Sequence, residues 1–177
     1  MDLRNILNNW RGRQRVTTTA IDDDGTAGAA ADLLQLGVRQ RQHAQYADAA
    51  RSLQRAIELK YDFGEAHHEL GLVYLEQEHF EDAVDCLELA THFAPQLAVA
   101  HLDLGSALTH LGRHDAAESA CRRALELEPH SAAGWLGLGN VVKARGDLEQ
   151  ASEHYRAAIE RDPTLANAHR QFAFVLY

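Results

Sequence analysis

Few residues in this sequence can crosslink, break or stiffen a chain. Its 177 residues include two cysteines, three prolines, one methionine and two tryptophans. The cysteines, Cys86 and Cys121, lack the spacing of a metal-binding motif, and we expect a reducing, cytoplasmic location. Alanine and leucine dominate and β-branched residues are scarce. Together with the shortage of proline, this composition favours helices over strands.

Long apolar runs and an excess of positive charge are also missing. No stretch is apolar for long enough to span a bilayer, and the start, Met1 to Arg4, shows no apolar region of a secretory signal. The formal net charge is −9, which argues against nucleic acid as the main partner and mildly favours basic partners. Hydrophobic residues make up 46% and charged residues 24%, values that are typical of a globular domain with its own core.

What the sequence does contain is a repeat of 34 residues without insertions. Prolines, glycines, alanines and leucines recur at this spacing: Pro95, Pro129 and Pro163; Gly37, Gly71, Gly105 and Gly139; Ala49, Ala83, Ala117 and Ala151; Ala56, Ala90, Ala124 and Ala158; Leu36, Leu70, Leu104 and Leu138. Five series in one register predict a repeat architecture, in which each unit buries its apolar face against its neighbours.

The repeats occupy residues 30–63, 64–97, 98–131 and 132–165, and each is expected to form two helices. In the third repeat, the apolar pattern predicts helices over 98–111 and 114–128, with a turn at Gly112 and a stop at Pro129. Gly105 and the small alanines would let the two helices approach closely, while larger side chains fill the space beside them. Positions are numbered below from the first residue of each repeat.

These residues resemble the tetratricopeptide repeat (TPR) family. The fourth repeat matches the family pattern well, and the first departs from it at Gln40 and Tyr61, as a terminal repeat can; the matching residues of the fourth are Trp135, Leu138, Gly139, Val142, Ala151, Tyr155, Ala158 and Pro163. The resemblance implies an all-α, right-handed superhelical solenoid of antiparallel helix pairs. It also implies a module that binds proteins, with no catalytic residue and no cofactor.

Both ends of the chain lie outside the four complete repeats. Residues 1–29 are expected to form a short basic amphipathic helix over 2–11 followed by a flexible linker over 17–28, with either a weakly packed terminus or a docking segment as its role. Residues 166–177 continue the repeat as the first helix of a fifth unit or as a capping helix. Their apolar side chains predict that the natural chain continues or that another copy covers this end: Phe172, Phe174, Val175, Leu176 and Tyr177.

Helix geometry predicts where a partner would bind. Positions 4, 7, 8 and 11 of each first helix face the core, so positions 5, 6, 9 and 12 face the opposite way, towards the concave groove that the resemblance implies. The alternative is that the leucines there only pack neighbouring first helices. We expect a partly apolar groove for a peptide or a helix, lined by Leu34, Val38, Arg41, His68, Glu69, Leu72, Leu102, Asp103, Ser106, Leu136, Asn140 and Lys143.

Catalytic and metal chemistry is not supported by the pattern. His67, His101 and His169 share position 4, where the family often has a large residue, so packing is their expected role. Cys121 occupies a core position, and neither cysteine is accompanied by a base and an orienting group. No metal site is expected. Because position 5 is mostly leucine, only Asn140 and Lys143 fit the carboxylate clamp of some family members.

Three functional hypotheses remain at this stage. The first is a module that binds a protein or peptide, with no nucleic-acid partner and no stable membrane insertion. The second is the N-terminal recognition arm of a larger enzyme of glycosyltransferase or sulfotransferase type, which the interrupted fifth repeat suggests. The third is a scaffold that self-assembles through the C-terminal end or the N-terminal helix.

Overall fold

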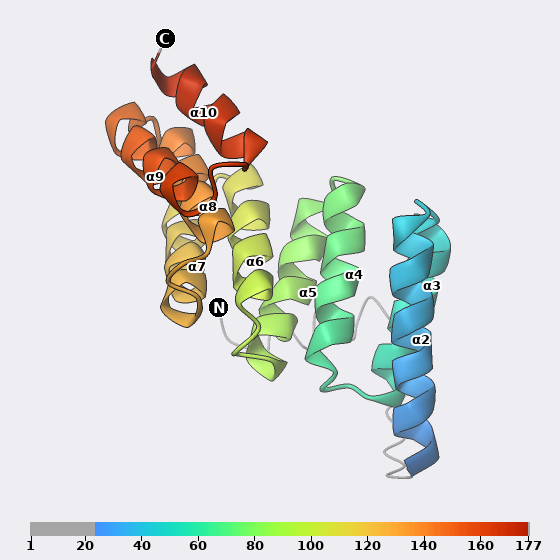
Figure 1. Cartoon of the computed structure of the whole chain (residues 1–177). Coiled ribbons are helices and arrows are strands. Elements are labelled where there is room, and N and C mark those ends of the chain that lie inside the picture. Colours follow the sequence, from blue (N-terminus) through green and yellow to red (C-terminus); the bar gives the residue numbers. More distant parts are fainter. Residues whose placement is uncertain (1–23, 177) are drawn as a thin grey trace. The chain divides into compact units, whose positions relative to one another are not determined.

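A computed structural model of the chain describes residues 24–176, which form nine helices (Figure 1). The helices are α2 (Asp24–Gln42), α3 (Tyr46–Leu59), α4 (Gly64–Glu76), α5 (Phe80–Phe93), α6 (Ala98–His110), α7 (His114–Leu127), α8 (Ala132–Arg145), α9 (Leu148–Arg161) and α10 (Ala166–Leu176). The predicted helix over 2–11 and Tyr177 lie outside the described residues. Because α2 begins at Asp24, the last five residues of the predicted linker are helical, in keeping with the alanines that follow.

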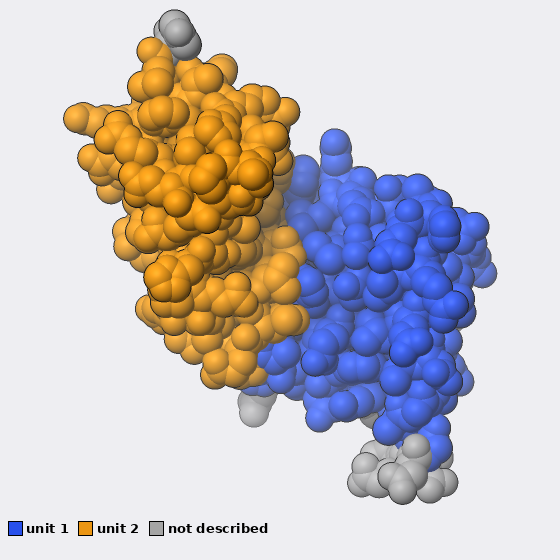
Figure 2. Space-filling view, in the orientation of Figure 1, with its two compact units in different colours: residues 1–94 blue, residues 95–177 orange. Residues whose placement is uncertain are grey.

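The helices pack as consecutive antiparallel pairs, and contacts divide the chain into two compact units (Figure 2). Unit 1 ends at Ala94 and contains the pairs α2/α3 and α4/α5; unit 2 begins at Pro95 and contains α6/α7, α8/α9 and the single helix α10. Within unit 2, α8 also contacts both helices of the preceding pair, and α10 packs on α9. The prediction of an all-α fold made of helix pairs is therefore confirmed.

Each pair is held together where a glycine at position 8 meets a larger side chain at position 24. A Cβ built on Gly37 would lie 2.6 Å from Cγ of Leu53, and one on Gly71 would lie 2.7 Å from Cγ of Leu87. Gly105 meets Cys121 in the same way, and Gly139 meets the ring of Tyr155. The recurring glycine thus has a steric cause, because any side chain there would push the paired helices apart.

The turn inside each pair has one backbone conformation in all four repeats. The residue at position 15 has a positive φ: 56° at Ala44, 61° at Glu78, 70° at Gly112 and 97° at Gly146. The amide of the next residue then donates to a carbonyl five residues back, as from Arg113 to Leu108 at 2.9 Å. This arrangement closes the first helix in the manner of a Schellman motif.

A ring nitrogen at position 4 bonds to the loop between successive pairs. Nε2 of His67 lies 2.9 Å from the carbonyl oxygen of Tyr61, and Nε1 of Trp135 donates to that of Pro129 at 3.4 Å. His101 and His169 make the same contact with Pro95 and Pro163 at 3.2 and 2.9 Å. The histidines at position 4 therefore have a role beyond packing, since each donates a hydrogen bond to a carbonyl of the loop before its helix.

Both units have an apolar core between their helices. In unit 1 the buried core is formed by Ala49, Leu53, Ala56, Ile57, Ala66, Leu70, Val73, Cys86 and Leu89. In unit 2 Val142, Ala151 and Tyr155 form a buried cluster, and Leu136, Phe172 and Val175 pack against it. No helix among residues 24–176 is both long and apolar enough to cross a bilayer.

Candidate functional site

In unit 1 the predicted groove residues lie on α2 and α4, where polar pairing occupies much of the surface. Nε of Arg41 lies 3.0 Å from a carboxylate oxygen of Glu69, and its NH1 lies 2.8 Å from one of Glu76. Side chains of Arg41 and Glu69 are each only 18% exposed. This bridge ties α2 to α4, so the cation at this end of the predicted groove is already neutralised within the chain.

The apolar groove residues of unit 1 are also partly engaged. Leu34 packs against the core cluster of the unit, and His68 on α4 is 7% exposed. Val38 and Leu72 are half-buried. In unit 1, therefore, the leucine and the histidine at position 5 are both at least half-buried.

In unit 2 the predicted residues come together around a hollow of about 300 Å³. Leu102 and Ser106 reach it from α6, and Asn140 and Lys143 from α8. Gln171 of α10 completes the polar side. A volume at the lower end of the range for ligand pockets, ~300–1,000 Å³, suits one large side chain or a short segment of a partner.

Two polar side chains at the hollow are held in fixed orientations. The hydroxyl of Tyr155 donates to Oδ1 of Asn140 at 3.0 Å, which leaves the amide Nδ2 without a hydrogen-bond partner among residues 24–176. Nζ of Lys143 donates to Oε1 of Gln171 at 2.7 Å and lies 5.3 Å from the ring centre of Phe174. No carboxylate of the described part of the chain lies within ion-pair distance of Lys143. The hollow therefore combines an uncompensated positive charge with a spare amide donor.

The remaining predicted residues of unit 2 lie beside the hollow or away from it. Leu136 packs on the cluster of Val142 and Tyr155, together with Phe172 and Val175 of α10. Asp103 is half-buried on α6. Among the residues of the predicted C-terminal surface that are described, Phe174 is 69% and Leu176 59% exposed, whereas Phe172 and Val175 turn towards the core.

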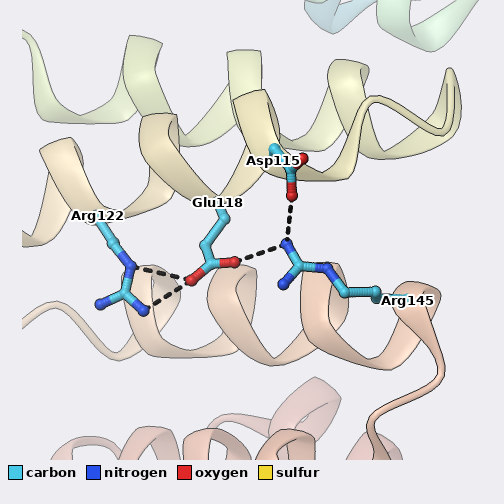
Figure 3. Close-up of polar contacts among 4 residues, drawn as sticks. All are labelled: Asp115, Glu118, Arg122 and Arg145. Carbon is cyan, nitrogen blue, oxygen red and sulfur yellow. Dashed lines mark hydrogen bonds and ion pairs between the residues drawn. The ribbon is translucent and has the colours of Figure 1, made fainter.

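A second and larger hollow, of about 530 Å³, lies over the charged face of α7. Its charged side chains are paired: Arg122, and Arg145 of α8 outside the lining, both contact Glu118 at 2.7 Å, and Arg145 also contacts Asp115 at 3.1 Å (Figure 3). The hydrogen bond from Arg122, with a second from Arg145, lowers the pKa of Glu118. These mutually satisfied charges link α7 to α8 and leave little for a ligand to recognise.

Groups that could act chemically are not assembled for catalysis in the described residues. Burial, followed by the nearby charge of Glu118, raises the pKa of Cys121 to about 12, so its thiol stays protonated and is a poor nucleophile. Among residues 24–176, no three side chains of histidine, cysteine, aspartate or glutamate gather as a metal ion would require.

Sequence reasoning missed part of the lining of the unit 2 hollow. His110, Cys121 and Ala144 also border it, in addition to Thr109 and Gly137, which the repeat places at the groove-facing positions 12 and 6. Cys121 comes from the second helix of its pair, and its Sγ would lie 3.3 Å from a Cβ built on Gly137.

The sequence profile of the tetratricopeptide repeat family matches residues 34–98, 68–132 and 102–166. These overlapping matches run continuously through all four helix pairs and cover well over half of the chain. The chain belongs to the tetratricopeptide repeat family. The resemblance inferred from the spacing of its prolines, glycines and alanines is thereby confirmed.

Solved structures show the same TPR fold. The MamA protein shares 23% identity over 83% of this chain and 80% of its own, with a TM-score of 0.73. PilF of Pseudomonas aeruginosa shares 21% over 87% and 70%, with a TM-score of 0.78. YrrB, described as a TPR protein with an unusual peptide-binding site, shares 22% over 81% and 74%, with a TM-score of 0.67. A search of curated protein sequences finds no match.

These findings settle the class of function at a coarse level. The TPR fold is generally a protein–protein interaction module, and its members are typically not catalysts. No enzyme family is detected in the sequence. The fold implies protein partners for the chain.

Proposed function

We propose that this TPR chain binds a peptide or helical segment of a partner protein along the first helices of unit 2, with the hollow of that unit as the anchor site. The observation that carries the proposal is the hollow itself, where Leu102, Asn140 and Lys143 converge from α6 and α8. An apolar wall beside a few fixed polar groups is the usual composition of a recognition site. The charge of Lys143 would then be matched by an acidic group of the partner.

Unit 1 offers no comparable anchor, because Arg41 is paired with Glu69 and Glu76. An incoming carboxylate would have to displace these two. We therefore assign the specific contacts to unit 2.

The test is selection of random peptides displayed on phage against the whole chain, followed by titration of the selected peptides by calorimetry. Leu102→Glu places a charge on the apolar wall of the hollow and should weaken binding by more than tenfold, about 1.4 kcal/mol or more. Ala116→Glu, at an exposed position of α7, is the matched control and should bind as the original chain does. Equal binding by Leu102→Glu and the original chain would refute the proposal.

Leu136→Glu is unsuited to this test. Because Leu136 packs on the cluster around Tyr155, a charge there would destabilise the fold and lower binding for a reason unrelated to the hollow. Circular dichroism melts of every variant separate the two effects.

Exposed apolar side chains on α10 favour a second candidate, self-association through this end of unit 2. Phe174 and Leu176 are 69% and 59% exposed and lie on an eleven-residue helix. Light scattering over a range of concentrations tests this candidate. A mass that grows with concentration for the original chain, but not for a Phe174→Ser, Leu176→Ser double variant, would support it; a monomer throughout would exclude it.

A further inference from the structure

Helix α8 contains three internal glycines, and packing accounts for only two of them. A Cβ on Gly134 would lie 2.6 Å from Cδ2 of Leu125, and one on Gly139 would run into the ring of Tyr155. A Cβ on Gly137 would meet no backbone and only two side-chain atoms, Sγ of Cys121 at 3.3 Å and Cδ2 of Leu102 at 3.7 Å. A small movement of the thiol would admit it. Close packing of helices therefore does not explain Gly137.

Gly137 also weakens the helix in which it lies. A glycine in the middle of a helix costs about 0.5–1 kcal/mol relative to alanine, because more backbone freedom is lost on folding. The other three repeats have longer, polar side chains at this position 6, namely Gln35, Glu69 and Asp103. Gly137 lowers the stability of its helix and is not required by packing. We therefore look for its role in binding rather than in folding.

The place of Gly137 supplies that role, since it lies in the lining of the unit 2 hollow. Cys121 lies beneath it and is the smallest of the four residues at position 24, where the other repeats have Leu53, Leu87 and Tyr155. Two small residues therefore lie side by side in the lining of a hollow that Leu102, Asn140 and Lys143 also line. A side chain of ordinary length at position 137 would occupy that space.

We propose that Gly137 keeps the hollow open for one bulky apolar side chain of the partner, next to an acidic side chain that pairs with Lys143. This inference rests on the proposed function and makes it more specific. The apolar side chain would be in contact with Leu102 and the neutral thiol of Cys121. The carboxylate would be bound by Lys143, which no acidic residue of the described chain neutralises, with Asn140 Nδ2 as a second donor.

The probes are short acetylated and amidated peptides of alanine and serine that carry one Leu, Phe or Trp. In one set this residue is next to Asp, in a second next to Lys, and in a third next to Ser. Binding to the whole chain is followed by NMR through amide shifts in α6 and α8. We expect measurable binding in the order Asp over Ser over Lys, and none for peptides that lack the bulky residue.

Two substitutions then test the role of Gly137. Gly137→Leu fills the hollow and should lower the affinity for the best peptide by more than about tenfold. Gly137→Ala should lower it about threefold while the melting temperature stays equal or rises, because alanine favours the helix. Lys143→Gln should abolish the preference for Asp over Ser. Ala116→Leu on the exposed face of α7 is the control for a larger apolar side chain and should leave affinity unchanged.

The outcomes separate this inference from the broader proposal. If Leu102→Glu abolishes binding but both Gly137 variants bind as the original chain does, the groove is used and the anchor role of Gly137 is wrong. If Leu102→Glu has no effect either, the proposed function fails as well. Binding that shows no preference for Asp over Ser would overturn the acidic side-chain contact. If Gly137→Leu does not fold, Gly137→Ala alone tests the role of Gly137: a threefold loss of affinity supports it, and unchanged affinity refutes it.

Discussion

At the scale of single residues, the ring at position 4 is the clearest case of one contact repeated along the chain. His67 is fully buried, its Nε2 faces the carbonyl of Tyr61, and its ring stacks on Phe93 with centroids 5.6 Å apart. Burial lowers the pKa of His67 to about 4, although the bond to the Tyr61 carbonyl opposes the shift. The neutral ring is therefore the form that the folded chain holds.

This pKa predicts that the chain loses stability in mild acid. The folded-state value lies below that of the unfolded chain, about 6.5, so the contribution of His67 is complete above pH ~6.5 and is lost as the pH falls towards 4. The loss should be on the order of 3 kcal/mol, at about 1.4 kcal/mol per pH unit. Urea unfolding across this range measures it. His67→Trp keeps a ring N–H, as Trp135 does, and should remove this part of the pH dependence.

A second prediction at this scale concerns the turn at position 15. Ala44 and Glu78 adopt a positive φ that Gly112 and Gly146 adopt without strain. Glu78→Gly should raise the free energy of unfolding by about 0.5–1 kcal/mol, since a left-handed conformation costs a non-glycine residue about 1–2 kcal/mol. Gly112→Ala is the converse and should lower it by a similar amount. Thermal melts that show the opposite signs would contradict this account of the turn.

At the scale of the helix pair, the close approach of the two helices at position 8 determines how much an added methyl group lowers the free energy of unfolding. Gly71 in α4 faces Leu87 in α5, whereas Gly28 in α2 has nothing within 4 Å of an added Cβ. Gly71→Ala should therefore destabilise the chain by about 1–3 kcal/mol through overpacking. Gly28→Ala should stabilise it by up to about 1 kcal/mol through helix propensity. Chemical denaturation gives the free energy of unfolding of the two variants, and so compares the same substitution at a tightly packed and at an open position.

The helix pairs are also where the sequence was most informative. Spacing alone predicted the frame, the helices, the turn at Gly112 and the reason for Gly105, because local repeats fix local geometry. It did not predict which groove residues would be used within the chain. Arg41 and Glu69 both occupy groove positions, and only the structure shows that they bind one another. Gly137 was visible in the sequence, but its meaning depends on Cys121 and Leu102, which come from two other helices.

At the scale of the whole molecule, each unit is built from contacts between helices that are near one another in the chain. In unit 2, Phe172 and Val175 of α10 pack on the buried cluster around Tyr155, as Leu136 of α8 does. Stability in such a chain is a sum of repeat and interface contributions, and loss of one element affects mainly the next.

Removal of residues 166–177 should therefore act locally. The chain ending at residue 165 should lose on the order of 2 kcal/mol from α8 and α9, because the apolar side chains that α10 covers become exposed. Helices α2 to α5 should be unaffected. Hydrogen exchange followed by mass spectrometry checks this: faster exchange confined to residues of unit 2 is expected, and equal acceleration in unit 1 would show coupling that neighbour contacts cannot explain.

The bond from position 4 to the preceding loop has a consequence for how such a chain can be rebuilt. The same hydrogen bond, from the ring at position 4 to a carbonyl six residues back, occurs at each loop that precedes a first helix from α4 onward. The rings are those of His67, His101, Trp135 and His169. We therefore expect that residues 98–131 can be duplicated as a unit. In a second copy inserted after residue 131, the histidine at position 4 would bond to the proline carbonyl of the first copy. The proline carbonyl of the second copy would accept the hydrogen bond from Trp135. Such a chain could be lengthened by whole repeats without the design of a new linker.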